Sequence, residues 1–131
     1  MTLPLSPADR FARLPELLAM DDDLRRRGRF ACVDCRIDIG SEPFFLSIVD
    51  GALTGFDRGP RLMRGTAFTL RATDEAWTRY WAPVPQPGWH DLFALAKRGA
   101  ASMEGDFRPL LQHLQYFKDL LALPRRLGGG A

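Results

Sequence analysis

Residues 31–39 alternate between apolar and polar side chains, which is the period of a β-strand with one buried face. The apolar set is Ala31, Val33, Cys35, Ile37 and Ile39. Further strands are expected at 44–49, 52–56, 66–72 and 101–105. The dipeptide Asp50-Gly51 is a strong signal for a two-residue hairpin between two of them. The pattern therefore predicts a meander of strands, with one more strand near the end of the chain.

Helix signals flank these strands. Ser6 before Pro7 predicts a first helix with a side-chain cap, and Pro15 predicts the start of a second helix that ends at Gly28. In that second helix we expect three acid–base pairs four residues apart: Asp21–Arg25, Asp22–Arg26 and Asp23–Arg27. They favour a solvated, self-neutralised helix face over an anion or membrane-surface patch.

The second half of the chain alternates helices with loops. Thr73 is expected to cap a helix that carries Trp77, Tyr80 and Trp81, and residues 92–99 read as another short helix. Asp106 is expected to cap a closing helix that Pro124 ends. Together these elements predict an α+β fold, with helices on the dry face of one sheet.

Composition narrows the function. The chain has 131 residues, the size of one domain, and its net charge of +2 gives no argument for nucleic acid. The N-terminal stretch lacks the apolar run of a signal peptide, and no window approaches the about 18 apolar residues of a membrane span. We therefore expect a cytoplasmic protein with at most transient contact to a membrane surface.

Cys32 and Cys35 form a lone CxxC motif. Zinc would need a second pair of ligands, and within a strand the two thiols point to opposite faces. The chain has two histidines, His90 and His113. Such a set predicts two reduced thiols and neither a metal site nor a cofactor.

Catalytic motifs are weak as well. His90-Asp91 invites a general-base reading, with Ser47 or Ser102 as a nucleophile, but neighbours in sequence rarely form a catalytic pair. The Gly-x-Ser-x-Gly elbow of hydrolases is missing from the sequence, and its glycines fit no phosphate-binding loop. We expect no enzyme activity.

The closing helix has an unusually wide apolar side. Its arc holds Phe107, Leu110, Leu111, Leu114, Phe117 and Leu121. Periodicity alone favours core packing, because a long apolar stripe is more often core than ligand site. The alternative is that this side covers a bound hydrophobic molecule.

From about Leu24 to Ala122, roughly three quarters of its length, the chain resembles the sterol carrier protein type 2 family of lipid-binding domains. The resemblance is carried by Val49-Asp50-Gly51, by the segment 73–77 at a helix start, and by Gly105-Asp106 before the last helix. The proline-rich loop 83–87 and the aspartate run 21–23 depart from the family's pattern.

The resemblance implies a five-stranded, mostly antiparallel sheet with helices packed on one face, and a hydrophobic tunnel between the two layers. It divides the chain into a helical lead-in, 1–23, a lipid-binding domain, 24–123, and a flexible tail, 124–131. The ligand would be a fatty acid, an acyl-CoA or a sterol-like lipid. Our candidate tunnel lining is Phe44, Leu46, Ile48, Phe68, Leu70, Trp77, Trp81, Phe93, Leu110, Leu114 and Phe117.

Three functions stay open on the sequence alone. The chain is a carrier of a hydrophobic small molecule, an accessory module that presents such a molecule to a separate enzyme or assembles with it, or a small α+β enzyme. A protein partner or a homodimer is compatible with each. Retained lipid would favour the first function, and an exposed apolar patch around Trp77, Trp81 and Trp89 with no internal cavity would favour the second. A strongly shifted titration of His90 inside a cleft would favour the third.

Overall fold

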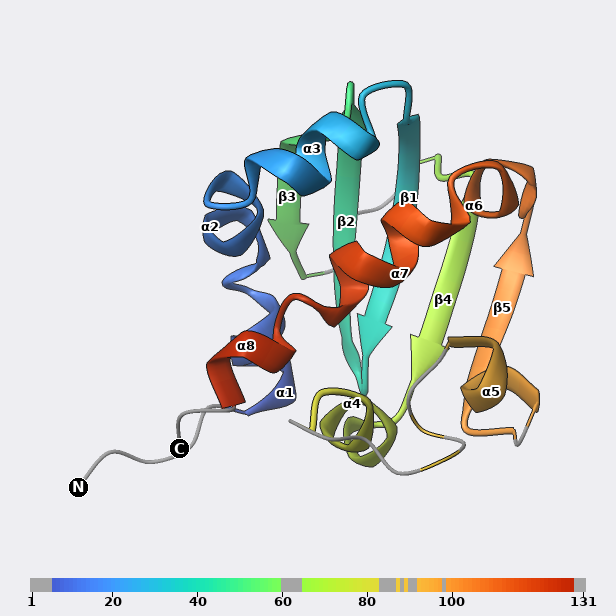
Figure 1. Cartoon of the computed structure of the whole chain (residues 1–131). Coiled ribbons are helices and arrows are strands. Elements are labelled where there is room, and N and C mark those ends of the chain that lie inside the picture. Colours follow the sequence, from blue (N-terminus) through green and yellow to red (C-terminus); the bar gives the residue numbers. More distant parts are fainter. Residues whose placement is uncertain are drawn as a thin grey trace.

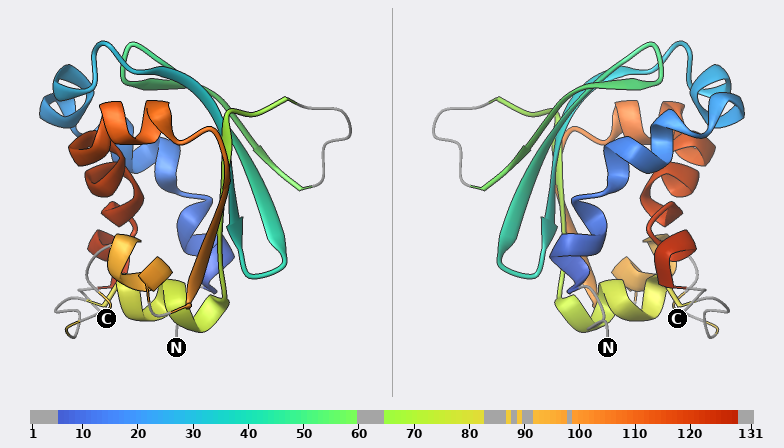
Figure 2. Two further views of the ribbon diagram at one scale, coloured as in Figure 1. Left: turned by 90° about the vertical axis from the view of Figure 1, so that its right-hand side faces the viewer. Right: turned by 90° about the vertical axis from the view of Figure 1, so that its left-hand side faces the viewer.

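The computed structural model describes residues 6–59, 65–82, 87, 89, 92–97 and 99–128. Five strands form one sheet in the order β3-β2-β1-β4-β5. All neighbouring strands are antiparallel except β1 and β4, which are parallel. The helices lie on one face of the sheet, as the edge-on views of Figure 2 show. The α+β prediction, with a mostly antiparallel sheet, is therefore confirmed.

The predicted strands are all present (Figure 1). Their bounds are β1 Cys32–Ile39, β2 Glu42–Val49, β3 Ala52–Arg58, β4 Phe68–Ala72 and β5 Ala101–Gly105. Alternation decides which side chains face the helices: the pairs Cys35↔Phe68 and Ile37↔Leu70 place apolar residues of β1 and β4 side by side. On the opposite face Asp38, although buried, is ion-paired with Arg36 and Arg71. The sheet thus has one dry and one polar face.

The hairpin between β2 and β3 is as tight as Asp50-Gly51 predicts. Asp50 has φ 54° and Gly51 has φ 79°, so both central residues adopt the left-handed conformation of the favoured hairpin turns. A Cβ atom on Gly51 would overlap the backbone carbonyl of Arg25. Glycine at this position therefore lets the hairpin approach the third helix of the chain.

The N-terminal helices are α1 Pro7–Phe11, α2 Leu14–Ala19 and α3 Asp22–Arg27. Ser6 caps α1 as predicted, by accepting a hydrogen bond from the Asp9 backbone N–H. The single helix expected from Pro15 to Gly28 is wrong, because Asp21 accepts the N–H of Leu24 and so starts a new helix. Gly28 does terminate α3.

This cap shifts the ion pairs on α3. Asp22 pairs with Arg25 and Asp23 with Arg26, three residues apart, while Asp23 also pairs with Arg27. Only the last of the three predicted pairings is correct, since Asp21 caps the helix and pairs with Arg126 while Asp22 pairs with Arg25. The prediction of a self-neutralised face still describes Arg25 and Arg26.

The middle of the chain contributes α4 Asp74–Tyr80 and α5 Leu92–Lys97. Thr73 caps α4 as expected, through a hydrogen bond from the Ala76 backbone N–H. The predicted start at His90-Asp91 and the proline-rich loop 83–86 lie outside the described residues.

The closing helix is interrupted. The structure has α6 Arg108–Gln112 and α7 Leu114–Ala122, with His113 between them at φ −122° and ψ 40°. The N-cap position of α6 is Phe107, so Asp106 lies one residue before the cap, and its side chain accepts the backbone N–H of Arg108. The prediction of one continuous helix from 107 to 121 is therefore wrong, and its apolar arc is divided between two short helices.

A final helix, α8 Arg125–Gly128, follows Pro124. Arg125 donates two hydrogen bonds to the Tyr80 carbonyl at the end of α4, and Arg126 pairs with Asp21 at 2.7 Å. The Pro124 carbonyl, just before α8, accepts a hydrogen bond from Arg10 of α1. The two arginines at the start of the segment expected as a tail, 124–131, thus have partners on distant elements.

Candidate functional site

The structure brings most of the candidate lining residues together in one apolar cluster between the sheet and the helices. Nine of the eleven are at most 2% exposed: Phe44, Leu46, Ile48, Phe68, Leu70, Trp77, Trp81, Leu110 and Phe117. Leu114, at the start of α7, is half-buried. Phe93 belongs to α5, but its side chain lies outside the described residues. Whether these residues line a ligand site stays a prediction.

The end of the interior near α1 and α4 is filled by stacked rings. Trp77 and Trp81 stack with centroids 5.1 Å apart, and Phe11 lies 6.1 Å from Trp81 on a nearly parallel plane. Both indoles are also fixed by hydrogen bonds: Trp77 donates to the Asp38 carbonyl and Trp81 to the Leu121 carbonyl, at 3.0 and 2.8 Å. A buried indole with a satisfied N–H is typical of a rigid core.

A second ring cluster lies under α7. Phe117 contacts Phe68 of β4 edge-to-face at 5.6 Å, and Tyr116 lies 5.5 Å from Phe117. The Tyr116 hydroxyl donates a 2.6 Å hydrogen bond to the Gly51 carbonyl, and burial raises the pKa of this phenol. Tyr116 thereby ties the closing helices to the β2–β3 hairpin.

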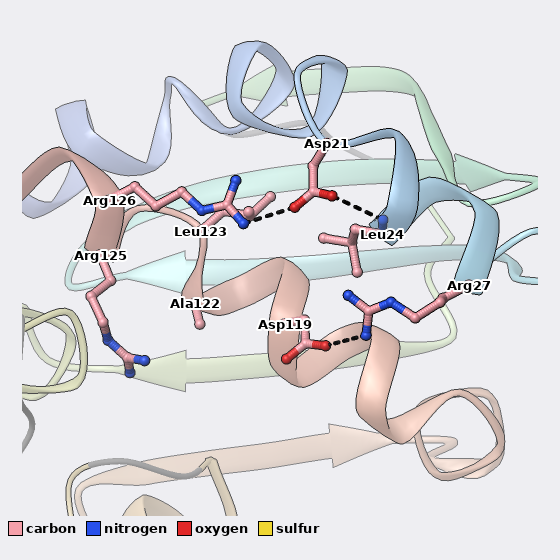
Figure 3. Close-up of a pocket in the computed structure, with 8 residues that line it drawn as sticks. All are labelled: Asp21, Leu24, Arg27, Asp119, Ala122, Leu123, Arg125 and Arg126. Carbon is pink, nitrogen blue, oxygen red and sulfur yellow. Dashed lines mark hydrogen bonds and ion pairs between the residues drawn. The ribbon is translucent and has the colours of Figure 1, made fainter.

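A pocket of about 500 Å³ opens where α3, α7 and α8 meet (Figure 3). Its floor is apolar and its rim is charged. The lining residues are Asp21, Leu24, Arg27, Asp119, Ala122, Leu123, Arg125 and Arg126. The volume falls in the range of about 300–1,000 Å³ that small-molecule sites occupy. None of the eleven candidates lines this pocket.

Two ion pairs span the pocket. Arg126 of α8 bonds Asp21 at 2.7 Å, and Arg27 of α3 bonds Asp119 of α7 at 2.7 Å. The Leu24 backbone N–H and then Arg126 hold the pKa of Asp21 below its usual range, while Asp119 raises the pKa of Arg27. Figure 3 shows Arg125 turned away from these pairs. Both shifts favour the charged forms of Asp21 and Arg27.

Sequence reasoning did not find this pocket. The sequence pattern predicts that the aspartate run belongs to a self-neutralised helix face, with its partners on the same helix. The pairs that build the rim join residues about a hundred positions apart, such as Asp21 and Arg126. The unusual aspartate run was the only available signal, and it carried no information about its distant partners.

The two thiols are free, with Cys32 exposed and Cys35 buried. Burial raises the pKa of the Cys35 thiol to about 12, so this group is protonated and inert at neutral pH.

We expect iodoacetamide at pH 8 to modify Cys32 in the folded protein and Cys35 only after unfolding, as followed by intact mass. Rapid double modification of the native protein would contradict the burial of Cys35.

The described residues do not test the catalytic interpretation of His90-Asp91. His90 and Asp91 lie outside them. Within the described ranges no group of three or more His, Cys, Asp and Glu side chains could hold a metal ion. Among the described helices, none combines the length and the apolar character of a membrane span.

Solved structures show a clear likeness in fold. A crystal structure of sterol carrier protein 2 matches with a TM-score of 0.67 and 14% sequence identity, over 88% of this chain and 93% of that one. Sterol carrier protein 2 from Yarrowia lipolytica, in its apo form, matches with a TM-score of 0.57 and 12% identity, over 95% and 98% of the two chains. The ubiquinone synthesis protein UbiJ-SCP2 matches with a TM-score of 0.57 and 18% identity, also over 95% and 98%.

Sequence comparison adds nothing to this likeness, since neither a model of a protein family nor a curated protein matches the chain. At these identities the structural matches establish the fold. The chain therefore has the sterol carrier protein type 2 fold, as its sequence resemblance implies.

Proposed function

We propose that the protein binds a hydrophobic small molecule, with the apolar part of the ligand between the sheet and the helix layer. The observation that carries the proposal is the composition of the inner face of the sheet. Its buried side chains on β1, β2 and β4 are all apolar: Cys35, Ile37, Ile39, Phe44, Leu46, Ile48, Phe68, Leu70 and Ala72. The match in fold to sterol carrier protein 2 supports the same interpretation.

Hydrophobic burial alone can supply the affinity. Each buried methylene contributes about 0.8 kcal/mol, so a twelve-carbon chain gains roughly 10 kcal/mol before its own ordering is counted. The free-energy cost of displacing the side chains that fill the interior opposes this gain. The β5 end is less tightly enclosed, since Met103, Ala101 and Phe107 are only partly buried against the core. We propose that the ligand chain lies toward this end.

Native mass spectrometry of the gently purified protein, followed by titration with a fluorescent fatty acid, tests the proposal. Co-purified lipid or saturable one-to-one binding is expected. A clean apo mass together with no binding of fatty acid or of a neutral lipid would contradict it, and the wide apolar side of α6 and α7 would then be core only.

The substitution Leu114→Trp should abolish fatty-acyl binding and leave the fold intact. Leu114 is half-buried at the start of α7, so a larger ring can enter the proposed ligand space without displacing a fully packed side chain. Fluorescent fatty-acid titration measures the first effect and circular dichroism the second. Leu111→Trp is the matched control. Leu111 is 57% exposed on the adjacent α6, so this variant should bind the fatty acid as the wild type does. Unchanged binding by Leu114→Trp would show that the ligand does not lie beside α7.

A second function is favoured by a different observation. Phe30 is 74% exposed and Val49 is 44% exposed, near the end of the sheet where β1 begins and β2 ends. Figure 1 shows α6, which carries the exposed Leu111, toward the same end. The patch expected around the tryptophans is wrong, since Trp77 and Trp81 are fully buried, so a contact surface would have to form at this other end of the sheet. The fold likeness to UbiJ-SCP2, a ubiquinone synthesis protein, supports an accessory role in which the protein presents its ligand to a separate enzyme.

We further propose that the protein catalyses no reaction of its own and that it acts in the cytoplasm. The first statement rests on the lack of a nucleophile-and-base arrangement in its sequence motifs. The second rests on its two free thiols, which suit a reducing compartment. Assay of the purified protein against acyl esters and fractionation of cells that express it are the corresponding tests.

A further inference from the structure

We infer that the pocket between α3, α7 and α8 binds the carboxylate of an anionic amphiphile, so that the protein selects fatty acids over neutral lipids of the same chain length. This inference rests on the proposed function. It concerns a charged site on the outer side of the helix layer, whereas the predicted lining residues lie beneath that layer.

The first argument is charge. Three arginines and two aspartates line the pocket, which leaves one positive charge uncompensated. Arg125 carries that charge, because its guanidinium bonds the Tyr80 carbonyl rather than a carboxylate. A single carboxylate would bring the rim to neutrality. A dianionic phosphate would overcompensate it.

The second argument is the supply of donors. Arg27 uses Nε and Nη1 on Asp23 and Asp119, and Arg126 uses Nη2 on Asp21. Their remaining N–H groups make no hydrogen bond to any residue that the structure describes. Figure 3 shows the two side chains on opposite sides of the pocket with their head groups directed into it. Guanidinium groups match a carboxylate in geometry as well as charge.

The third argument is continuity with the interior. The floor residues Leu24 and Leu123 are almost fully buried and belong to the same apolar cluster as Phe117. An acyl chain whose carboxylate lies at the rim would have to displace Leu24 or Leu123 to enter the helix–sheet interior, and would then run beneath α7 toward the β5 end. The pocket thus has a charged rim for a head group and an apolar floor for the chain attached to it.

The test compares decanoate with 1-decanol, two ligands that differ only in the head group, at low salt and below micelle formation. Isothermal titration of the wild-type protein should show about fivefold tighter binding of decanoate, the size that one partly exposed charge pair gives. Sodium chloride should reduce this preference and leave decanol binding unchanged. Monododecyl phosphate compared with laurate should show no preference for phosphate, and tighter phosphate binding would overturn the carboxylate assignment.

Substitutions locate the effect. Arg126→Gln should remove the preference for decanoate, whereas Asp119→Asn should increase it, since the rim gains a net positive charge and Arg27 regains a donor. An increase in affinity cannot come from damage to the fold. Arg26→Gln is the control, because Arg26 lies on α3 outside the pocket and changes the net charge by the same amount as Arg126→Gln.

Each outcome decides between the two proposals. Equal affinity for decanoate and decanol, or equal loss of preference in Arg26→Gln and Arg126→Gln, overturns the carboxylate site and leaves the hydrophobic-ligand proposal standing. Failure of both ligands to bind overturns both proposals.

Discussion

Replacing Gly51 by alanine should destabilise the fold by about 3 kcal/mol, through left-handed backbone strain and steric overlap together. Gly51 has φ 79°, a conformation that costs free energy for any residue with a Cβ atom. The new methyl group would also overlap the Arg25 carbonyl and the backbone of Gly28. Backbone atoms cannot rotate away as a side chain can, so α3 would have to move from the hairpin.

Gly99→Ala separates the two causes. Gly99 has the same φ of 79°, but a Cβ atom there would meet nothing within 4 Å. Its substitution should therefore show the backbone strain alone, about 1 kcal/mol. Urea denaturation followed by circular dichroism measures both free energies of unfolding. Equal losses in the two variants would mean that α3 does not press on the hairpin.

Gly28, at the end of α3, is packed as closely as Gly51. A Cβ atom at Gly28 would overlap the ring of Tyr116, whose hydroxyl bonds Gly51. Three distant segments thus meet at one point: the end of α3, the β2–β3 turn and α7. The sequence marks the first two as a helix stop and a hairpin, and both predictions are correct. That they touch is a long-range fact which no local pattern contains.

Strands could be predicted because their evidence is local. The alternation from Ala31 to Ile39 determines which face of β1 is apolar. Paired residues of neighbouring strands point to the same face, so the apolar side chains of β2 and β4 lie on that face too. The break at His113 could not be predicted, since the apolar positions continue at helical spacing across it. Likewise the pairing of Arg27 with Asp119 depends on the packing of α3 against α7. Much of the fold could therefore be predicted from the sequence, but the charged pocket could not.

Replacing Trp81 by alanine should destabilise the protein by about 4 kcal/mol, the loss typical of a buried large aromatic side chain. Trp81 is fully buried, stacks on Trp77 and Phe11, and bonds the Leu121 carbonyl. Trp81→Phe keeps an aromatic ring but leaves that carbonyl without its donor, so about 2 kcal/mol is expected. Urea denaturation measured by circular dichroism gives both values. A loss below 1 kcal/mol in Trp81→Ala would mean that this side chain borders free space rather than packed core.

The Trp81→Ala variant also shows which end of the interior is open to a ligand. Removing the indole leaves a closed apolar space, and such spaces stay dry and bind small aromatic molecules. Added indole should therefore raise the thermal midpoint of Trp81→Ala and leave the wild-type midpoint unchanged, because binding to the folded state alone stabilises it. If indole stabilised the wild type equally, room for a ligand would already exist beside α1 and α4. The hydrophobic ligand would then belong at this end of the sheet, and the β5 end would lose its place in the proposal.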